Sequence, residues 1–323
     1  FYVASQFDAA GQSFQSTFSI DKNTSIILGA AIILIYTLLG GFWAVSVSDT
    51  LQGVMMALSA IILPIVAISQ AGLDNIFTDL SKQAIFSSPD GIGGIVALGF
   101  ILGTMGIGIA YPGQPHVVNR FMALEPGKKV NQGRIIAICW ALIIYPGMIF
   151  IGWSGRILID IAGHEQILIV MGNQLLHPVL AGIILAAVLS AIMSTADSQL
   201  LVAASSVTHD LKSQKESYSL LKTRICVMVI CIMSVAMAIF VDKSIYSRVL
   251  FAFSTMGAAF GPLLLGRLQG GVPRFYAISA MVVGFFMTLF FYYSDLKPEG
   301  NPLERLVPIL LAYIIIQVGR KKT

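Results

Sequence analysis

Charged side chains are scarce in this sequence. Lys and Arg supply 20 of its 323 residues and Asp and Glu supply 16, so 11% of the chain is charged, whereas 56% is apolar. A soluble globular domain carries about 25% charged residues. The composition therefore argues against a soluble enzyme, a nucleic-acid-binding protein and a disordered chain. It predicts a protein that crosses a membrane several times.

Cysteine and the common catalytic motifs are scarce as well. Cys139, Cys226 and Cys231 lie in apolar runs without a spacing motif, which argues against a disulfide framework. The sequence has no His-Glu-x-x-His, Cys-x-x-Cys or Gly-x-Ser-x-Gly pattern. We therefore expect neither an enzyme nor a bound cofactor.

Long apolar runs dominate what is present. Roughly 20 apolar residues cross the hydrocarbon core of a bilayer as a helix, and by this measure the sequence predicts ten spans. The runs are too long and alternate too little for outer-membrane strands. The predicted spans are residues 1–18, 24–41, 44–70, 92–115, 135–157, 177–208, 220–241, 245–267, 274–293 and 303–319.

Successive loops differ in the sign of their net charge. By the positive-inside rule, the basic loops lie in the cytoplasm together with the C-terminus and, if there are ten spans, residue 1. A short turn that contains Asp242 is the exception, at +1. The basic segments are 116–134 (+3), 209–224 (+2), 267–274 and the C-terminal tail, and the acidic segments are 71–91 (−2), 155–176 (−1) and 294–305 (−1).

Glycine and proline interrupt one predicted span. Residues 103–116 contain four glycines and two prolines, and proline removes a backbone donor and clashes with the preceding helical turn. Broken helices at membrane depth line cavities, and they build the binding sites of many transporters. The sequence predicts such a break here. The alternative is a kinked helix end next to the cytoplasmic loop.

A second feature is a face of hydroxyl side chains in span 177–208. Ala191, Ser194, Thr195 and Ser198 follow helical spacing and share one face. Two hydroxyls and the Ala191 carbonyl provide oxygen ligands of the kind that a hard cation such as Na⁺ prefers. The alternative is that these hydroxyls only form hydrogen bonds within the helix or with a neighbouring one.

Two carboxylates, Asp49 and Asp197, fall inside predicted spans, where charge is costly and often functional. At the helical rise, Asp49 lies about 12 Å and Asp197 about 18 Å from the cytoplasmic side. The two acids are therefore close enough in depth to share a cation. Alternatively, Asp49 caps the start of its helix.

The opening span is unusually polar. Its polar residues form two helical stripes, and such a helix is expected to face protein or a cavity. Hydrogen bonding between helices and contact with a ligand both explain this polarity. One stripe consists of Tyr2, Gln6, Ala9 and Ser13, and the other of Ser5, Asp8, Gln12 and Gln15.

Several motifs occur together in a fixed order. They resemble those of the sodium/solute symporter family, and residues 111–122 resemble the corresponding stretch of bacterial sodium/proline symporters. The motifs are Gly40-Gly41 with Ala44-Val45, Asp49 and Gln52; Tyr111 to His116 with Arg120-Phe121-Met122; Met193-Ser194-Thr195 with Gln199-Leu200-Leu201; Ser205-Ser206 with Thr208 and Asp210; and Phe253 to Pro262, which includes Gly257 to Pro262.

The resemblance runs from Tyr2 to about residue 293 and implies an all-α, polytopic bundle of the LeuT type, built from two inverted five-helix repeats. In a single transmembrane domain, 1–323, residues 1–70 would end the first repeat, 92–267 would form the second, and 274–319 would add C-terminal helices. The chain begins at Phe1 without Met. We expect the broken helix of the first repeat to be missing ahead of it.

The resemblance also implies ligands. Ala191, Ser194 and Thr195 match the main sodium site of the family, and Asp49, Ser194, Asp197 and Ser198 match a second sodium site of some relatives. Asp197 replaces a frequent Ser and makes that site more anionic. Tyr2, Tyr111 and Pro115 match substrate-pocket positions, and Ile107 stands where proline carriers have Trp. The predicted substrate-binding set is Tyr2, Gln6, Ile107, Tyr111, Gln114 and Pro115.

The implied function is sodium-coupled symport of a small organic solute by alternating access, with proline or another amino acid as the solute and Na⁺ as the coupling ion. The alternatives are a sodium symporter for a sugar or carboxylate, and a channel or sensor on the same scaffold. The implied location is the plasma membrane of a bacterium, as a multi-pass protein. The expected partners are the solute, sodium and the lipid bilayer, without nucleic acid or an obligate protein partner.

Overall fold

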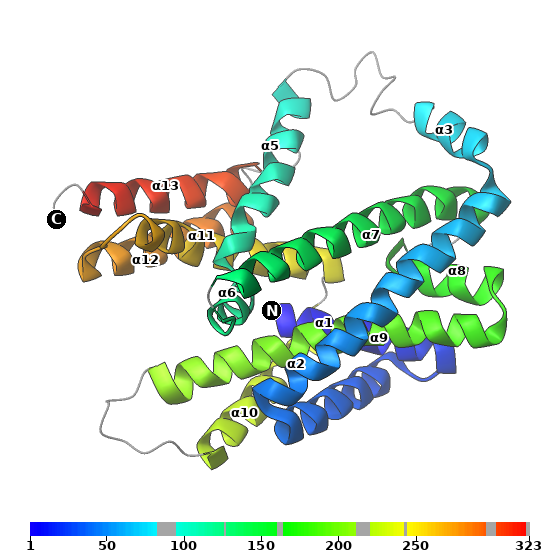
Figure 1. Ribbon diagram of the computed structural model, residues 1–323, viewed down its shortest axis with the longest axis horizontal. Helices are drawn as coiled ribbons and strands as arrows, with labels where there is room; N and C mark the ends of the chain where they lie inside the picture. The colour runs from blue at the N-terminus through cyan, green and yellow to red at the C-terminus, as the bar shows by residue number, and fades with distance from the viewer. Residues whose placement is uncertain are drawn as a thin grey trace. The chain divides into compact units, whose positions relative to one another are not determined.

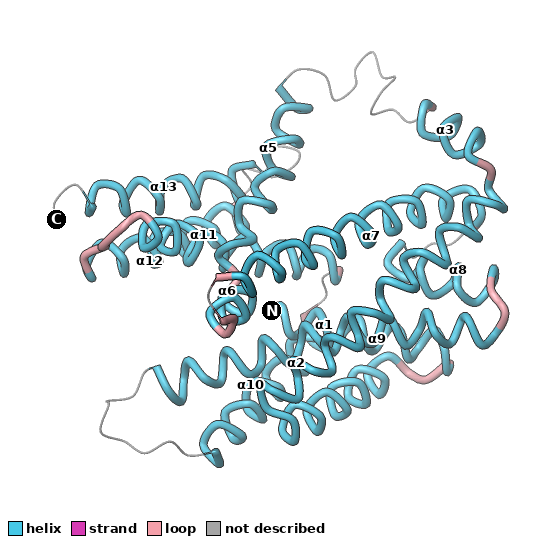
Figure 2. The backbone as a smooth tube through the Cα atoms, in the orientation of Figure 1, coloured by secondary structure: helices cyan, strands magenta, loops and turns pink. Residues whose placement is uncertain are grey.

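The computed structural model describes residues 1–82, 95–125, 127–159, 164–210, 220–241, 244–294 and 302–320. Within these ranges every regular element is a helix (Figures 1 and 2). Seven stretches of the described helices are long and apolar enough to cross a membrane. The prediction of an all-α, polytopic protein is confirmed.

The helices group into two units by their internal packing. The first unit contains α1 (Tyr2–Phe18), α2 (Lys22–Ala71), α3 (Leu73–Ser81), α7 (Lys128–Leu158), α8 (Ile167–Leu175), α9 (Pro178–Ser205) and α10 (Leu220–Phe240). The second contains α5 (Ile95–Ala110), η1 (Tyr111–Gly113), α6 (Pro115–Met122), α11 (Ile245–Leu268), α12 (Arg274–Tyr293) and α13 (Pro302–Arg320). Tyr2 groups with the second unit, unlike the rest of α1. The repeat boundaries expected from the sequence stay a prediction.

The predicted spans at 24–41 and 44–70 correspond to two apolar stretches, Lys22–Gly40 and Val45–Ala71, which α2 joins into one helix of 50 residues. Glycines such as Gly40 cost a helix only about 1 kcal/mol each, which the surrounding apolar helix tolerates. At the helical rise, 50 residues measure about 75 Å, more than twice the hydrocarbon core. In Figure 1 the darker and lighter blue parts of α2 point in different directions, so α2 provides two membrane crossings.

Three other predicted spans are shorter or less apolar than expected. Spans 1–18, 92–115 and 303–319 correspond to α1, α5 and α13, which are not among the seven stretches that meet the criteria for a crossing. α1 has 17 residues, and residues 92–94 lie outside the described part of the chain. That these three helices also cross the membrane, which would give ten spans, stays a prediction.

Small residues allow α1 and α2 to pack closely in the first unit. A Cβ on Gly11 would overlap Ile26, and a Cβ on Gly29 would lie 2.8 Å from that of Ala10. The core around this contact continues into α9 and α10, through residues such as Leu200. Apolar burial of this kind, together with close backbone approach, holds α9 against α2.

The second unit contains the predicted helix break. α5 continues as a regular helix to Ala110, so the first three glycines of the 103–116 stretch do not break it. The break is a single 3₁₀ turn, Tyr111–Gly113, followed by an extended Gln114 with φ −80° and ψ 113°. Pro115 then occupies the first turn of α6, where its missing donor costs nothing. The predicted break is confirmed and is confined to Tyr111–Gln114.

Glycines bring α11 against this break. A Cβ on Gly113 would lie 2.6 Å from the backbone nitrogen of Gly261, and a Cβ on Gly257 would overlap Ala110. Gly257 and Gly261 are four residues apart, so they form the small-xxx-small pattern that lets helices meet at backbone distance. The position of the break is therefore fixed by backbone contact with α11.

Candidate sodium and solute sites

The predicted main sodium ligands lie together on α9. The hydroxyl of Thr195 donates a hydrogen bond to the Ala191 carbonyl oxygen at 2.9 Å, and the hydroxyl of Ser194 donates to the same oxygen at 3.3 Å. Each hydroxyl keeps lone pairs that can accept a cation. The structure therefore brings the three predicted oxygen atoms into one cluster.

α9 also carries a buried carboxylate. Asp197 is fully buried, and its Oδ1 accepts a hydrogen bond from the Ser198 hydroxyl at 3.3 Å. The same hydroxyl lies 2.8 Å from the Ser194 carbonyl oxygen, and its single hydrogen can go to either acceptor. Ser194, Asp197 and Ser198 thus lie close together on one helix.

Asp49, the remaining member of the predicted second site, lies within α2, far from its N-cap residue Asp21. The alternative that Asp49 caps a helix start is therefore wrong. Its Oδ1 is buried, and its charge acts on the phenol of Tyr36, which the charge of Asp197 also reaches. The two carboxylates thus lie in one electrostatic environment of the first unit.

Tyr36 is a residue that the sequence reasoning missed. Its hydroxyl oxygen is buried and has no hydrogen-bond partner among the described residues. A single tyrosine in an apolar span belongs to no sequence pattern that would indicate a site residue. The proximity of Tyr36 to Asp197 arises only from the packing of α2 on α9.

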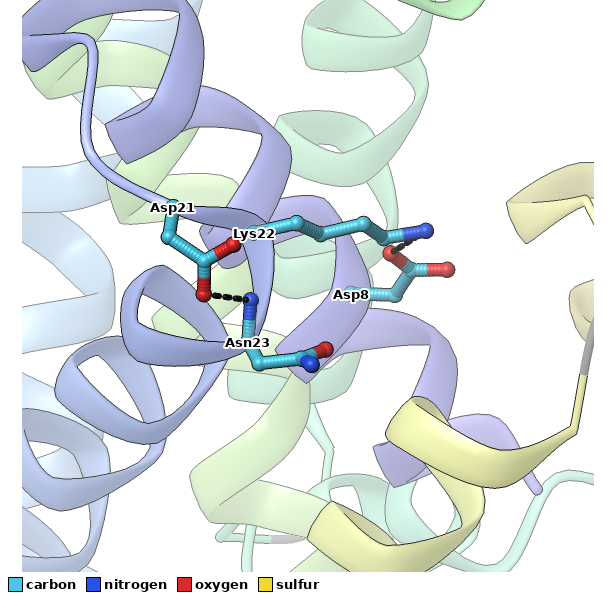
Figure 3. A network of polar contacts seen from close by, with 4 residues as sticks. All are labelled: Asp8, Asp21, Lys22 and Asn23. Carbon is cyan, nitrogen blue, oxygen red and sulfur yellow. Dashed lines mark hydrogen bonds and ion pairs between the residues drawn. The ribbon is translucent and has the colours of Figure 1, made fainter.

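Asp8, on the polar opening helix, has a cation partner. Its carboxylate is buried, and Oδ1 lies 3.5 Å from Nζ of the half-exposed Lys22, at the start of α2 (Figure 3). The neighbouring Asp21 caps α2 by accepting the backbone N–H groups of Asn23 and Thr24. A buried carboxylate without a cation is costly, so this pair anchors α1 to the beginning of α2.

The predicted substrate-binding residues fall in different places. Gln6 lies in the first unit, where its amide donates to the Ser5 hydroxyl at 3.4 Å. Ile107 is a half-buried residue of α5 in the second unit. Tyr111 and Pro115 flank the break in the same unit.

Gln114 is fully buried inside the break. Its Nε2 donates to the Ala110 carbonyl at 3.3 Å and to the Phe253 carbonyl at 3.1 Å. Its Oε1 is buried without a hydrogen-bond partner among the described residues. The amide therefore stabilises the broken backbone and joins it to α11.

An aromatic group surrounds the break. The ring of Phe253 lies 6.0 Å from that of Tyr111 and 6.5 Å from that of Tyr2, and the His116 ring meets Tyr2 edge-on at 6.3 Å. Burial, and then the charge of Arg120, lower the pKa of His116 to about 4. His116 is therefore neutral at physiological pH. Phe253 begins one of the sequence motifs, but sequence reasoning assigned it no role at the site, because it is one of 19 phenylalanines in an apolar chain.

The described residues contain no group of three or more His, Cys, Asp or Glu that could hold a metal ion. The α9 site offers the Ala191 carbonyl, the Ser194 and Thr195 hydroxyls and the nearby Asp197 carboxylate as possible ligands. Such a ligand set suits an alkali cation better than a transition metal, which prefers imidazole or thiolate.

Known proteins similar to this chain include sodium-coupled transporters. The model of the sodium:solute symporter family matches residues 1–284. The chain is 31% identical to a sodium/proline symporter from Staphylococcus aureus (strain bovine RF122 / ET3-1), over 99% of this chain and 67% of that protein. The sodium/proline symporter of Staphylococcus aureus strain Newman is also 31% identical, with the same coverage.

A solved structure is similar as well. It shows a Na⁺-coupled sialic acid symporter in a substrate-bound, outward-open state. The match has a TM-score of 0.72 and 19% sequence identity, and it covers 98% of this chain and 71% of that one. At 19% sequence identity, this similarity supports a shared fold and nothing more specific.

Proposed function

Because the chain belongs to the sodium:solute symporter family, we propose that it carries proline or another amino acid across the plasma membrane of a bacterium together with sodium. The printed names of its relatives support this solute class. The LeuT-type helical fold, which the solved symporter shares, suits transport by alternating access. The observation that carries the proposal is the cluster of the Ala191, Ser194 and Thr195 oxygens on one face of α9.

The α9 cluster explains how sodium binding biases the conformation. The Ser194 and Thr195 hydroxyls now donate to the Ala191 carbonyl. A cation at that carbonyl would require a hydroxyl to turn its hydrogen away and present a lone pair. Sodium then stabilises the state in which these oxygens converge, and a ligand shifts an equilibrium only by such a difference in affinity. One charge moving through 100 mV adds about 2.3 kcal/mol to the driving force.

The second cation site would lie between α2 and α9 in the first unit. Asp49 and Asp197 both act on the phenol of Tyr36, and Ser198 bonds to Asp197. Two carboxylates in one low-dielectric environment repel each other unless a cation or a proton compensates them. A second sodium ion shared by Asp49, Ser194, Asp197 and Ser198 provides that compensation.

Two alternatives concern the solute and the mode of transport. Ile107 is aliphatic where proline carriers have Trp, which argues against proline itself; a sugar or a carboxylate is the alternative solute. A channel or sensor is the other alternative. It predicts ion flux without saturation, or binding without uptake, and no described feature favours it over the symporter.

The direct test is uptake by the protein reconstituted in proteoliposomes. An inward sodium gradient should drive accumulation of radiolabelled proline or of a competing amino acid, because both ligands are bound in the same transport cycle. An inward potassium gradient of equal size and liposomes without protein are the controls. Uptake that proceeds equally well without the sodium gradient would refute symport.

Replacing Asp49 tests the second cation site. Asp49→Asn removes one of two charges that share an environment, and a contact to a charged group is worth about 1.5–3 kcal/mol. We therefore expect the sodium concentration for half-maximal uptake to rise about tenfold, or the number of sodium ions carried per solute to fall. The matched control is Asp74→Asn, at an exposed acid of α3. An unchanged sodium titration would make Asp49 a structural residue.

A further inference from the structure

Phe253 on α11 is the point where the break in the second unit meets its aromatic group. Its ring contacts those of Tyr111 and Tyr2 at centroid distances of 6.0 and 6.5 Å, within the range of attractive aromatic pairs. Its carbonyl oxygen accepts the Gln114 amide at 3.1 Å. Phe253 therefore contacts three of the residues predicted to bind substrate.

Phe253 packs closely against its surroundings. Its ring contacts a small core made by Ala110, Ala258 and Ile309, and Gly257, one helical turn later, has no room for a Cβ next to Ala110. The neighbouring Tyr111 is half exposed. The α11 backbone that carries Phe253 therefore lies directly against the end of α5.

The aromatic side chains around the break favour a solute with a positive charge. Aromatic faces carry negative partial charge, so they attract a positively charged nitrogen and disfavour an anion. His116 is neutral at physiological pH, and the charge near it is that of Arg120, which helps to lower its pKa. Nearby, the amide of Gln114 is fully buried and holds the break through its bonds to the Ala110 and Phe253 carbonyls.

We propose that Phe253 is a specificity-determining residue of the solute site. With Tyr111 and Tyr2 it forms an aromatic wall that selects a small zwitterionic amino acid, whose charged nitrogen and compact apolar carbons lie against the rings. This inference rests on the proposed symport function and assigns its solute class. Because Ile107, one helical turn before Tyr111, is aliphatic, Phe253 supplies aromatic surface that α5 does not.

The test compares Phe253→Leu with Phe253→Tyr in proteoliposomes, by uptake of radiolabelled L-proline and L-alanine and by competition with glycine betaine, D-glucose and propionate. Leucine keeps the apolar contact but removes the ring face. We expect it to raise the half-saturating amino-acid concentration about tenfold, with half-saturating sodium changed less than twofold. Phe253→Tyr should retain the wild-type value. Phe240→Leu, at a phenylalanine 83% exposed on α10, is the matched control.

The outcomes separate the two proposals. Sodium-driven uptake of D-glucose or propionate, with no competition by amino acids, would overturn the role of Phe253 and leave sodium symport standing. If Phe253→Leu leaves the half-saturating amino-acid concentration unchanged, the role of Phe253 in solute selection is also overturned. A Phe253→Leu variant that loses sodium affinity together with solute affinity would indicate a structural role instead. Absence of sodium-driven uptake of every solute in the wild type would refute the symport proposal itself.

Discussion

Thr195→Ala should raise the sodium concentration needed for half-maximal uptake by about tenfold or more, because a ligand to a charged group contributes about 1.5–3 kcal/mol. The Thr195 hydroxyl lies 2.9 Å from the Ala191 carbonyl, so its loss removes one of the clustered oxygens and leaves the helix in place. Ser194→Ala should act in the same direction. The half-saturating solute concentration at saturating sodium should change much less.

Two control variants separate ligand loss from helix damage. Thr195→Ser keeps the hydroxyl and should restore most of the sodium affinity. Thr288→Ala removes a fully buried hydroxyl from α12, where it donates to the Gly284 carbonyl at 2.9 Å in the same i to i−4 helical geometry. Sodium titrations of uptake measure all of these variants. If Thr195→Ala and Ser194→Ala both keep the wild-type titration, the assignment of the main sodium site to α9 is wrong.

Gly257→Val should abolish transport and destabilise the protein by several kcal/mol. Even the first added carbon would overlap Ala110 at the end of α5, and overpacking a rigid contact costs about 1–3 kcal/mol, more where backbone must move. The displaced α11 would also pull the Phe253 carbonyl from the Gln114 amide, a bond of 3.1 Å. We expect a clear fall in thermal midpoint in detergent and uptake near background.

The control for this prediction is another helical glycine with open space. A Cβ on Gly152 of α7 would meet nothing within 4 Å, so Gly152→Val should leave the thermal midpoint and uptake near wild type. A Gly257→Val protein with normal stability and normal uptake would show that α11 does not need to approach the break at backbone distance.

The location of the helix break was predictable because it depends on local chemistry. Pro112 and Pro115 cannot both continue a helix, and the structure breaks at Tyr111–Gln114. The extent of the break was not predictable, because Gly103, Gly106 and Gly108 tolerate either helix or loop. In the structure these glycines are helical, and α5 packs against α13 next to Gly106.

The role of Gln114 shows where local reasoning ends. Its position in the break predicted substrate binding, yet its amide nitrogen bonds to two backbone carbonyls. One of these belongs to Phe253, 139 residues away in sequence. No local pattern indicates such a partner. Lys22 and Asp8 likewise pair only because α2 crosses α1 at Gly11.

The sequence by itself determined that this protein is helical and built for a membrane, that a helix breaks within residues 103–116, and that Ala191, Ser194, Thr195 and Ser198 share one face of a helix. These features follow from composition, from proline chemistry and from the 3.6-residue period, all of which act over a few residues. Only the tertiary structure decided that α2 is one helix, that Tyr36 lies near Asp197, and that Phe253 joins Tyr111 and Gln114. Those facts depend on which helix faces meet, and close packing between residues distant in sequence sets them.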